Sequence, residues 1–161
     1  MAGTPLPLAV VDIDGVVADV RHRLHHVESR PKDWPAFFAS AAADPPLAEG
    51  VARVKELRAG HEVVYLTGRP EHLRGVTEEW LERHGIGGRV LMRRYRDFRP
   101  ARVSKAEELR RLARGRTVAV VIDDDPEVCA ALRAAGWPVE QAEWVPHGKT
   151  LREAQEREGR T

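Results

Sequence analysis

The stretch Leu8-Ala9-Val10-Val11-Asp12-Ile13-Asp14-Gly15 places two carboxylates directly after a run of apolar residues. The apolar run predicts a buried strand, and because side chains alternate along a strand, Asp12 and Asp14 face the same way. Gly15 then lets the backbone turn sharply and approach a ligand closely. One carboxylate can attack phosphorus while the other manages the leaving group's proton, and both can help to hold a divalent cation. A plain polar turn is the alternative interpretation.

Apolar runs alternate with amphipathic stretches along the rest of the chain, which is typical of a parallel sheet with helices on both faces. The expected strands are residues 8–13, 61–66, 89–92, 117–122 and 137–144. The expected helices are residues 34–43, 49–58, 70–84 and 104–113, with one more after Asp125. The sequence therefore predicts an α/β fold: a doubly wound, Rossmann-like parallel sheet of about five strands with a minimal cap.

Helix-start signals support three of these helices. Asp33 is a predicted N-cap, since its side chain can accept a hydrogen bond from the first turn. Ser104 and Glu107 have the spacing of a capping box. Asp125 is followed by Pro126, a residue favoured at the first helical position. These signals fix where we expect three helices to begin.

Length and composition predict one domain over residues 1–161, with its core at about 8–145 and a charged tail at about 146–161. We expect the tail to form a surface helix or to fray. No apolar run approaches the ~20 residues of a membrane span, and Leu6 to Val11 lacks the basic region of a signal peptide. The lone Cys129 predicts a small buried residue rather than a disulfide, which fits a cytoplasmic protein.

Positive charge is concentrated between Arg89 and Arg116. This stretch holds ten Arg and Lys105 against three acids, which gives 11 − 3 = +8, whereas the whole chain carries +1. The chain also uses 22 Arg but only 4 Lys. Two interpretations remain open: an anion-binding surface, or a GC-rich genome that chooses Arg for exposed positions.

Polar groups suited to a phosphate follow the predicted strand at 61–66. The sequence there is Thr67-Gly68-Arg69-Pro70. The Thr67 hydroxyl and nearby backbone N–H groups can bond phosphate oxygens, and Arg69 can bind them in a fork. In an open parallel sheet, ligands bind outside the carboxyl ends of the strands. We therefore expect Thr67 and Arg69 to lie near Asp12 and Asp14.

An acidic triplet, Asp123-Asp124-Asp125, follows the predicted strand at 117–122. Three adjacent acids repel one another unless a cation lies among them. Oxygen ligands point to Mg²⁺ rather than to zinc or copper. Lys105, directly after the predicted N-cap at Ser104, is placed to offset charge on an aspartate and on a phosphate.

The order Asp-x-Asp-Gly, then Thr, then Lys, then Asp-Asp resembles the haloacid dehalogenase (HAD) superfamily of aspartyl-phosphate phosphatases, over about Leu8 to Val145. The resemblance implies an Mg²⁺-dependent phosphomonoesterase. It implies that Asp12 is the nucleophile and Asp14 the general acid/base, whose carbonyl also binds Mg²⁺. It further implies that Thr67 holds the phosphoryl group, that Lys105 stabilises the intermediate, and that the remaining metal ligands are Asp123 and Asp124.

A narrower resemblance is to the 3′-phosphatase domain of polynucleotide kinase-phosphatases. It rests on Arg23 eleven residues after Asp12, on Arg69 two after Thr67, and on Leu91-Met92-Arg93-Arg94 leading to a basic loop. No Gly-x-x-x-x-Gly-Lys-Ser/Thr loop occurs in this sequence, so we expect no kinase half within it. The resemblance implies a DNA or RNA 3′ end as substrate. The predicted substrate-binding residues are Arg23, Gly68, Arg69, Arg94 and Arg96.

Other functions compete with this one. A phosphatase of nucleotides or other small metabolites would use the same chemistry. A phospho-acceptor signalling domain also combines aspartates, Thr and Lys, but it places the acceptor after a middle strand. A non-catalytic binding module is expected to lack Asp12, Asp14 or Lys105. His22, His25 and His26 have helical spacing, yet nothing nearby completes a metal site, so we expect surface or substrate-side residues.

Overall fold

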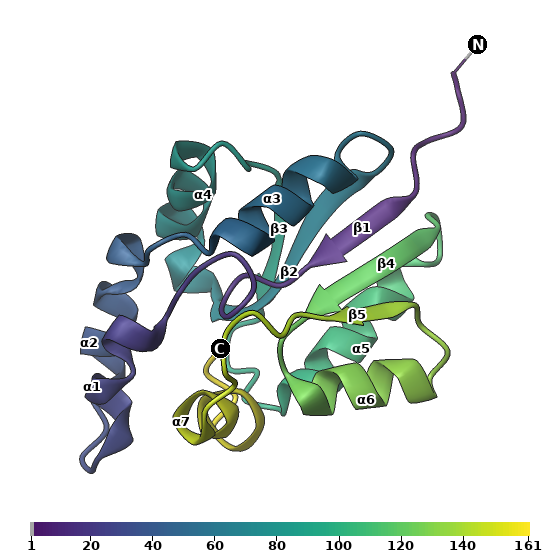
Figure 1. Cartoon of the computed structure of the whole chain (residues 1–161). Helices are drawn as coiled ribbons and strands as arrows, with labels where there is room; N and C mark the ends of the chain where they lie inside the picture. Colours follow the sequence, from purple (N-terminus) through teal and green to yellow (C-terminus); the bar gives the residue numbers. More distant parts are fainter. Residues whose placement is uncertain (1) are drawn as a thin grey trace.

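The computed structural model describes residues 2–161 and contains one sheet of five parallel strands. The strand order is β3-β2-β1-β4-β5 (Figure 1). The strands are β1 (Leu8–Val11), β2 (Glu62–Pro70), β3 (Arg89–Arg93), β4 (Val118–Asp123) and β5 (Val139–Gln141). The chain runs outward from β1 in one direction and then resumes on its other side at β4. The carboxyl ends of β1, β2 and β4 therefore meet where the strand order reverses, which is where open α/β sheets bind ligands.

Helices cover both faces of this sheet, so the predicted doubly wound α/β class is confirmed. On one face α3 (Ala48–Leu57) and α4 (Arg74–Arg83) pack against Ala9 and Val11. On the other face α5 (Ala101–Leu112) and α6 (Pro126–Ala134) pack against Leu8 and Val10 (Figure 1). The alternation of β1 side chains supplies both apolar cores. Within residues 2–161, no helix is long and apolar enough to cross a membrane.

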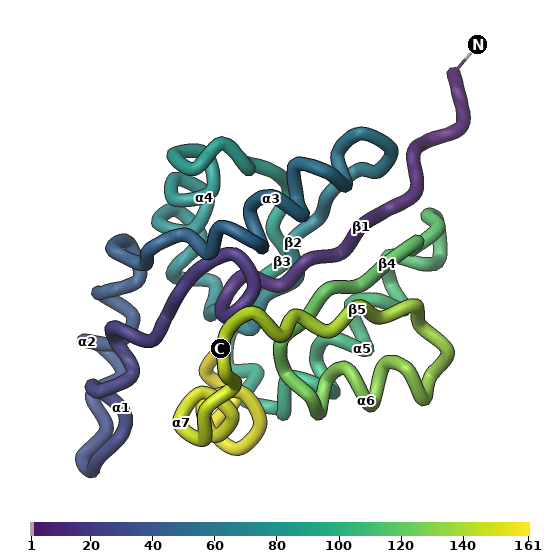
Figure 2. The backbone as a smooth tube through the Cα atoms, in the orientation of Figure 1, coloured from purple at the N-terminus to yellow at the C-terminus, as the bar shows by residue number. Residues whose placement is uncertain are grey.

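A small insertion follows β1 and projects beyond the carboxyl ends of the strands (Figure 2). It contains α1 (His25–Glu28), α2 (Trp34–Ala39) and 3₁₀ turns at Arg21–Arg23 and Ala41–Ala43. The Asp33 side chain accepts a hydrogen bond from the Ala36 N–H, which confirms the predicted N-cap. The helix expected over residues 34–43 instead breaks at Ser40. Phe37 is fully buried and anchors the insertion to the core.

Several element boundaries differ from expectation: the helix expected over residues 70–84 is α4 at Arg74–Arg83, and the strand expected over residues 137–144 is β5 at Val139–Gln141. The differences at α5 and β2 bear on the site. α5 begins at Ala101 rather than after Ser104, because Pro100 supplies the extended residue before the first turn. Ser104 therefore lies inside the helix, where its hydroxyl donates to the Ala101 carbonyl at 3.4 Å, and the predicted capping box is wrong. β2 continues to Pro70 through an irregular register after Leu66. The capping role of Asp125 is confirmed, since its side chain accepts from the Glu127 N–H.

The C-terminal tail packs against the carboxyl edge of the sheet. It contains α7 (Lys149–Arg152) and a π-helical turn at Glu153–Arg157. Leu151, Ala154 and Thr161 are buried. This burial differs from the expected surface helix or frayed segment, because the tail is held by ion pairs to α5 and α6 (Arg102–Glu156 and Arg152–Glu127) and lies against the basic loop, where Gly159 approaches the Phe98 backbone.

Candidate active site

Three carboxylates lie together at the carboxyl ends of β1 and β4. Ligand atoms of Asp12, Asp123 and Asp124 all lie within 4.8 Å of one another, and all three residues are buried. Gly15 permits this approach: it has φ +79°, and a Cβ there would lie 2.0 Å from Asp124 Oδ2. The predicted cluster of Asp12, Asp123 and Asp124 is thus assembled by the fold.

Lys105 supplies the positive charge in this cluster. From the second turn of α5, its Nζ lies 2.6 Å from Asp123 Oδ2 and 3.2 Å from Asp12 Oδ1. Burial alone lowers the pKa of the ammonium, but the charges of Asp12 and Asp123 more than offset it, so the pKa of Lys105 is raised. The ammonium is therefore permanently charged beside the predicted nucleophile, although the helix starts earlier than expected.

One ammonium does not balance three buried carboxylates. Burial, together with Asp123 and Asp14, raises the pKa of Asp12 to about 7 despite Lys105. Burial and the charges of Asp12 and Asp123 also raise the pKa of Asp124. Asp12 Oδ2 and Asp124 Oδ1 have no hydrogen-bond partner within residues 2–161. Two unpartnered carboxylate oxygens in an acidic cluster fit a hard divalent cation such as Mg²⁺.

The side chain of Asp14 turns away from this cluster to two arginines. Arg69 donates from Nε and Nη2 to Asp14 Oδ1 at 2.9 and 2.6 Å, and Arg23 Nη2 reaches the same oxygen at 3.4 Å. Burial disfavours the charged carboxylate, but the two guanidinium charges outweigh it and lower the pKa of Asp14 to about 2. Asp14 is therefore held as a carboxylate. Its predicted role as a carbonyl ligand of Mg²⁺ stays a prediction.

A second buried carboxylate, Asp44, completes the arginine cluster. It lies between α2 and α3, and it accepts hydrogen bonds from both Arg23 and Arg69. His22 Nε2 lies 2.6 Å from Asp44 Oδ1, whereas His25 and His26 do not contact Asp44. Sequence reasoning missed Asp44, because an acid before two prolines has no spacing that relates it to Asp12 or Asp14.

Thr67 and Gly68 lie at the same edge, as expected. Thr67 is buried, and its hydroxyl accepts a hydrogen bond from the Arg69 N–H at 3.1 Å. Gly68 lies against the tail, since a Cβ there would be 2.1 Å from the Thr161 carbonyl carbon. The Thr161 hydroxyl also donates to Asp14 Oδ2. Thr161 therefore occupies space beside Asp14 and Gly68, which no sequence pattern indicated.

The basic loop after β3 divides into internal and exposed arginines. Arg93 is buried and donates to the carbonyls of Gly68 and Arg99 at 2.9 and 2.7 Å. Arg99 pairs with Asp97 and with Glu107. Arg94, Arg96 and Arg99 are exposed. Of these three, Arg94 and Arg96 are the predicted substrate-binding residues, and Arg99 is the one held by two acids.

Much of the remaining positive charge in this stretch is paired locally or with distant acids. Arg102 contacts Glu156 and Arg116 contacts Glu62, while Arg111 contacts acids one turn earlier in α5. The net charge of +8 counted along the sequence therefore overstates the positive field of this surface. Arg94 and Arg96 of the basic loop are the exposed arginines of this stretch that line the pocket described next.

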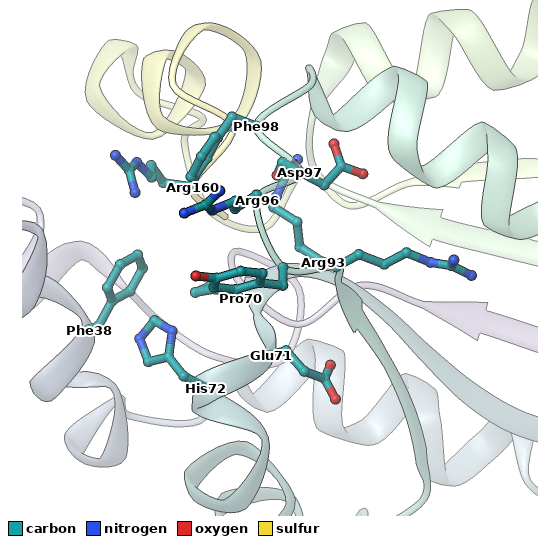
Figure 3. Close-up of a pocket in the computed structure, with 12 residues that line it drawn as sticks. Phe38, Pro70, Glu71, His72, Arg93, Arg96, Asp97, Phe98 and Arg160 are labelled. Carbon is teal, nitrogen blue, oxygen red and sulfur yellow. Dashed lines mark hydrogen bonds between the residues drawn. The ribbon is translucent and has the colours of Figure 1, made fainter.

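A pocket of about 400 Å³ lies between the insertion, the end of β2, the basic loop and the tail (Figure 3). Two of its lining residues adjoin the predicted phosphate site: Pro70 directly follows Arg69, and Arg93 donates to the Gly68 carbonyl. Its walls combine rings with guanidinium groups: the Phe38 and His72 rings are 5.2 Å apart, and the Arg160 guanidinium lies 4.6 Å from the Phe98 ring centroid. The lining residues are Phe38, Pro70, Glu71, His72, Arg93, Arg94, Tyr95, Arg96, Asp97, Phe98, Gly159 and Arg160.

A paired-aspartate strand end, a buried lysine and an acidic cluster, assembled on this sheet, have the arrangement of a HAD-type phosphatase. Over residues 7–144 the chain matches the family described as the polynucleotide kinase PNKP phosphatase domain. The chain belongs to this family and is a phosphoric monoester hydrolase. A search of curated proteins finds no match.

Solved structures agree with this fold. A chain in a structure of the Pnkp1/Rnl/Hen1 complex has a TM-score of 0.71 at 23% identity, covering 90% of this chain and 49% of that one. A chain in the Pnkp1/Rnl/Hen1 RNA repair complex has a TM-score of 0.69 at 25% identity, covering 89% and 44%. The present chain thus spans about half the length of these relatives. A HAD family enzyme from Bacteroides thetaiotaomicron, complexed with magnesium and inorganic phosphate, has a TM-score of 0.52 at 9% identity, covering 91% and 98%.

Proposed function

We propose that this chain is a Mg²⁺-dependent phosphatase that removes 3′-phosphate from nucleic-acid ends through an aspartyl-phosphate on Asp12. The observation that carries the substrate assignment is the ring- and arginine-lined pocket next to the predicted phosphate site. Rings can stack on a nucleobase, and arginines can follow a phosphate backbone. Membership of the PNKP phosphatase family and the likeness to chains in an RNA repair complex support the same substrate class.

Asp12 is the proposed nucleophile, because its carboxylate lies at the end of β1 beside Lys105. In the first half of the reaction one oxygen of this carboxylate forms a bond to phosphorus, and the bond from phosphorus to the substrate oxygen breaks. Lys105, 3.2 Å from Asp12 Oδ1, would offset the negative charge that gathers as the phosphate approaches. Bound Mg²⁺ would neutralise phosphate charge, held by Asp12, Asp123 and Asp124.

Asp14 is the proposed proton carrier. A proton on Asp14 would pass to the leaving oxygen in the first half, and Asp14 would take a proton from the attacking water in the second half. Thr67 and the N–H groups of the following turn would hold the phosphoryl oxygens. Asp14 is a carboxylate before substrate binds, so the substrate's own negative charge must raise its affinity for a proton.

The alternative substrate is a nucleotide or another small phosphorylated metabolite, since a pocket of about 400 Å³ also suits a single nucleoside. Phosphate release from a 3′-phosphorylated oligonucleotide, a 3′-mononucleotide and an aryl phosphate separates the two. We expect the highest kcat/KM for the oligonucleotide. A higher value for the mononucleotide would overturn the nucleic-acid assignment while leaving the phosphatase chemistry in place.

A further inference from the structure

Asp44 is the one fully buried carboxylate of the arginine cluster that the proposed reaction does not use. Its side chain is 0% exposed. Its Oδ1 accepts from Arg23 Nε at 2.8 Å, and its Oδ2 accepts from Arg23 Nη2 and Arg69 Nη2 at 3.0 and 2.8 Å. Charge-assisted contacts of this kind are short, directional and strong. Asp44 thus holds two guanidinium groups at once.

The backbone of Asp44 is itself held in place. Its carbonyl accepts from the Trp80 indole N–H at 2.8 Å, and its N–H donates to the Ala41 carbonyl at 3.2 Å. Trp80 is a buried residue of α4. The carboxylate is therefore fixed relative to the core of the sheet rather than to the exposed part of the insertion.

The two arginines transmit this position to Asp14. Both bind Oδ1 of Asp14, and Arg69 is further fixed by its Nη1 bond to Thr77 Oγ1 at 3.1 Å. Oδ2 of Asp14 is left for the site, where the Thr161 hydroxyl donates to it. The arrangement decides which of the two oxygens of Asp14 meets the reacting groups.

We propose that Asp44 is a positioning residue, which fixes the Arg23–Arg69 pair and so presents Asp14 Oδ2 to the reacting phosphate. Two guanidinium groups that share one acceptor oxygen repel each other, and Asp44 neutralises that repulsion. Without its charge, the pair has one carboxylate for two cations. The arginines then move apart and Asp14 loses its fixed orientation.

This inference rests on the proposed function, in which Asp14 handles protons in both halves of the reaction. In the second half, water forms a bond to phosphorus and the bond from phosphorus to Asp12 breaks. The electron pair returns to Asp12, and Asp14 Oδ2 takes the proton of the water. When the substrate is an aryl phosphate with a good leaving group, the phenolate departs without a proton, so the first half of the reaction does not need Asp14. Loss of Asp14 positioning should therefore slow only the second half with that substrate.

The test is pre-steady-state hydrolysis of an aryl phosphate by Asp44→Asn, which keeps the shape of the side chain and removes its charge. We expect a burst of one equivalent of phenol close to the wild-type rate. Steady-state turnover should fall at least ~10-fold, part of the ~10²–10⁴ that a positioned base contributes. Phosphoenzyme should accumulate and be detected by mass spectrometry after acid quenching. Asp44→Glu, which restores the charge, should recover part of the turnover.

Asp33→Ala is the matched control. It removes the N-cap of α2 and so loosens the insertion, but it leaves the Asp44 carboxylate, its backbone bonds and both arginines in place. If Asp44 only anchors the insertion, Asp33→Ala will reproduce the accumulation of phosphoenzyme, and the inference is overturned. Equal falls of burst and turnover in Asp44→Asn, or unchanged turnover, would also overturn it. Asp44→Ser is the second variant should Asp44→Asn fail to fold.

The outcome also separates this inference from the proposed function. If the wild-type protein releases phosphate from none of the three substrates, both the proposed function and the role of Asp44 are refuted. An active wild-type protein whose Asp44→Asn variant behaves like the Asp33→Ala control would refute only the role of Asp44.

Discussion

The two halves of the site are equally buried but differ in net charge. The acidic half consists of Asp12, Asp123, Asp124 and Lys105; the arginine half consists of Asp14, Asp44, Arg23 and Arg69. In the acidic half three carboxylates face one ammonium, and in the arginine half two carboxylates face two guanidinium groups. The difference in charge balance, not in burial, decides how each half behaves.

The pKa values of the aspartates show the consequence. Burial and like charges raise the pKa of Asp12 to about 7, whereas two arginines lower the pKa of Asp14 to about 2. The pKa values of two aspartates only two residues apart are thus shifted in opposite directions by the charges around them. A buried cluster with excess negative charge is costly unless a cation joins it. The acidic half is suited to bind one, and the arginine half needs none.

The largest expected effect comes from removing the nucleophile of the acidic half. Asp12→Asn should lower phosphate release by at least ~10³-fold in Mg²⁺, as loss of a covalent nucleophile requires. Without metal the same variant should melt at a higher temperature than the wild type, because it removes one uncompensated buried charge. Asp19→Asn, at a surface aspartate paired with Arg21, is the control. Near wild-type turnover of Asp12→Asn would refute the assignment of the nucleophile.

Metal removal should also act through the acidic half. After exhaustive EDTA treatment we expect activity to fall at least ~10²-fold and to return with Mg²⁺, because the phosphate's charge is then no longer neutralised. Isothermal titration of the metal-free protein should detect Mg²⁺ binding, and Asp124→Asn should weaken it. Full activity in EDTA would show that Lys105 alone compensates the cluster.

The two halves should differ in how pH affects stability. The folded pKa of Asp12 lies above its usual 3.8, so its contribution to stability is complete below about 4 and is lost as pH rises through about 7. Asp14 has the opposite sign, but its contribution is lost only as pH falls from about 4 through about 2. Between pH 5 and pH 8 the metal-free Tm should therefore fall, by at least ~3 °C if ~1 kcal/mol is involved. Saturating Mg²⁺ or Asp12→Asn should flatten this slope; an unchanged slope would contradict it.

The sequence predicts all the residues of the acidic half, but it misses one of the four residues of the arginine half, Asp44, for a physical reason. Asp12, Asp14 and the Asp123–Asp124 pair directly follow or end strands, and the order of parallel strands brings strand ends together. Lys105 was placed correctly although its predicted cap was wrong, because a helix that begins earlier still passes the same edge. Asp44 lies in an irregular segment, where no periodicity relates a residue to the site.

Thr161 was unpredictable for a related reason. Its place depends on how the tail packs after α7, and the charged composition of that tail suggested exposure. For the stretch from Arg89 to Arg116 the sequence overestimates the exposed positive charge, because a count of Arg along the chain does not include the acids that distant segments bring to it. Glu62, Glu127 and Glu156 pair with Arg116 and Arg102, which the sequence count included in the +8.

A smaller effect is expected at the junction between the tail and the arginine half. The Thr161 hydroxyl donates to Asp14 Oδ2, so an incoming phosphate ester must displace it. Thr161→Gly should lower KM for a small aryl phosphate by about 3- to 10-fold, the equivalent of one hydrogen bond, with kcat little changed. Lys149→Ala, an exposed change in α7, is the control. A higher KM would instead mean that Thr161 forms part of the substrate site.

The smallest effect on catalysis should come from the exposed arginines outside both halves. Arg94 pairs only with Glu108, at 3.4 Å, and Arg96 contacts the exposed Tyr95 ring, so neither supports the buried site. Arg94→Ala/Arg96→Ala should weaken binding of a 3′-phosphorylated oligonucleotide and reduce its salt dependence by about one to two released counterions. Hydrolysis of an aryl phosphate should stay within twofold of the wild type, about 0.4 kcal/mol. Arg110→Ala/Arg114→Ala, at exposed positions on α5 and just beyond its end, is the matched control for loss of two charges. Equal losses on both substrates would place the loop within the catalytic core, and no loss on either would favour genomic preference for Arg.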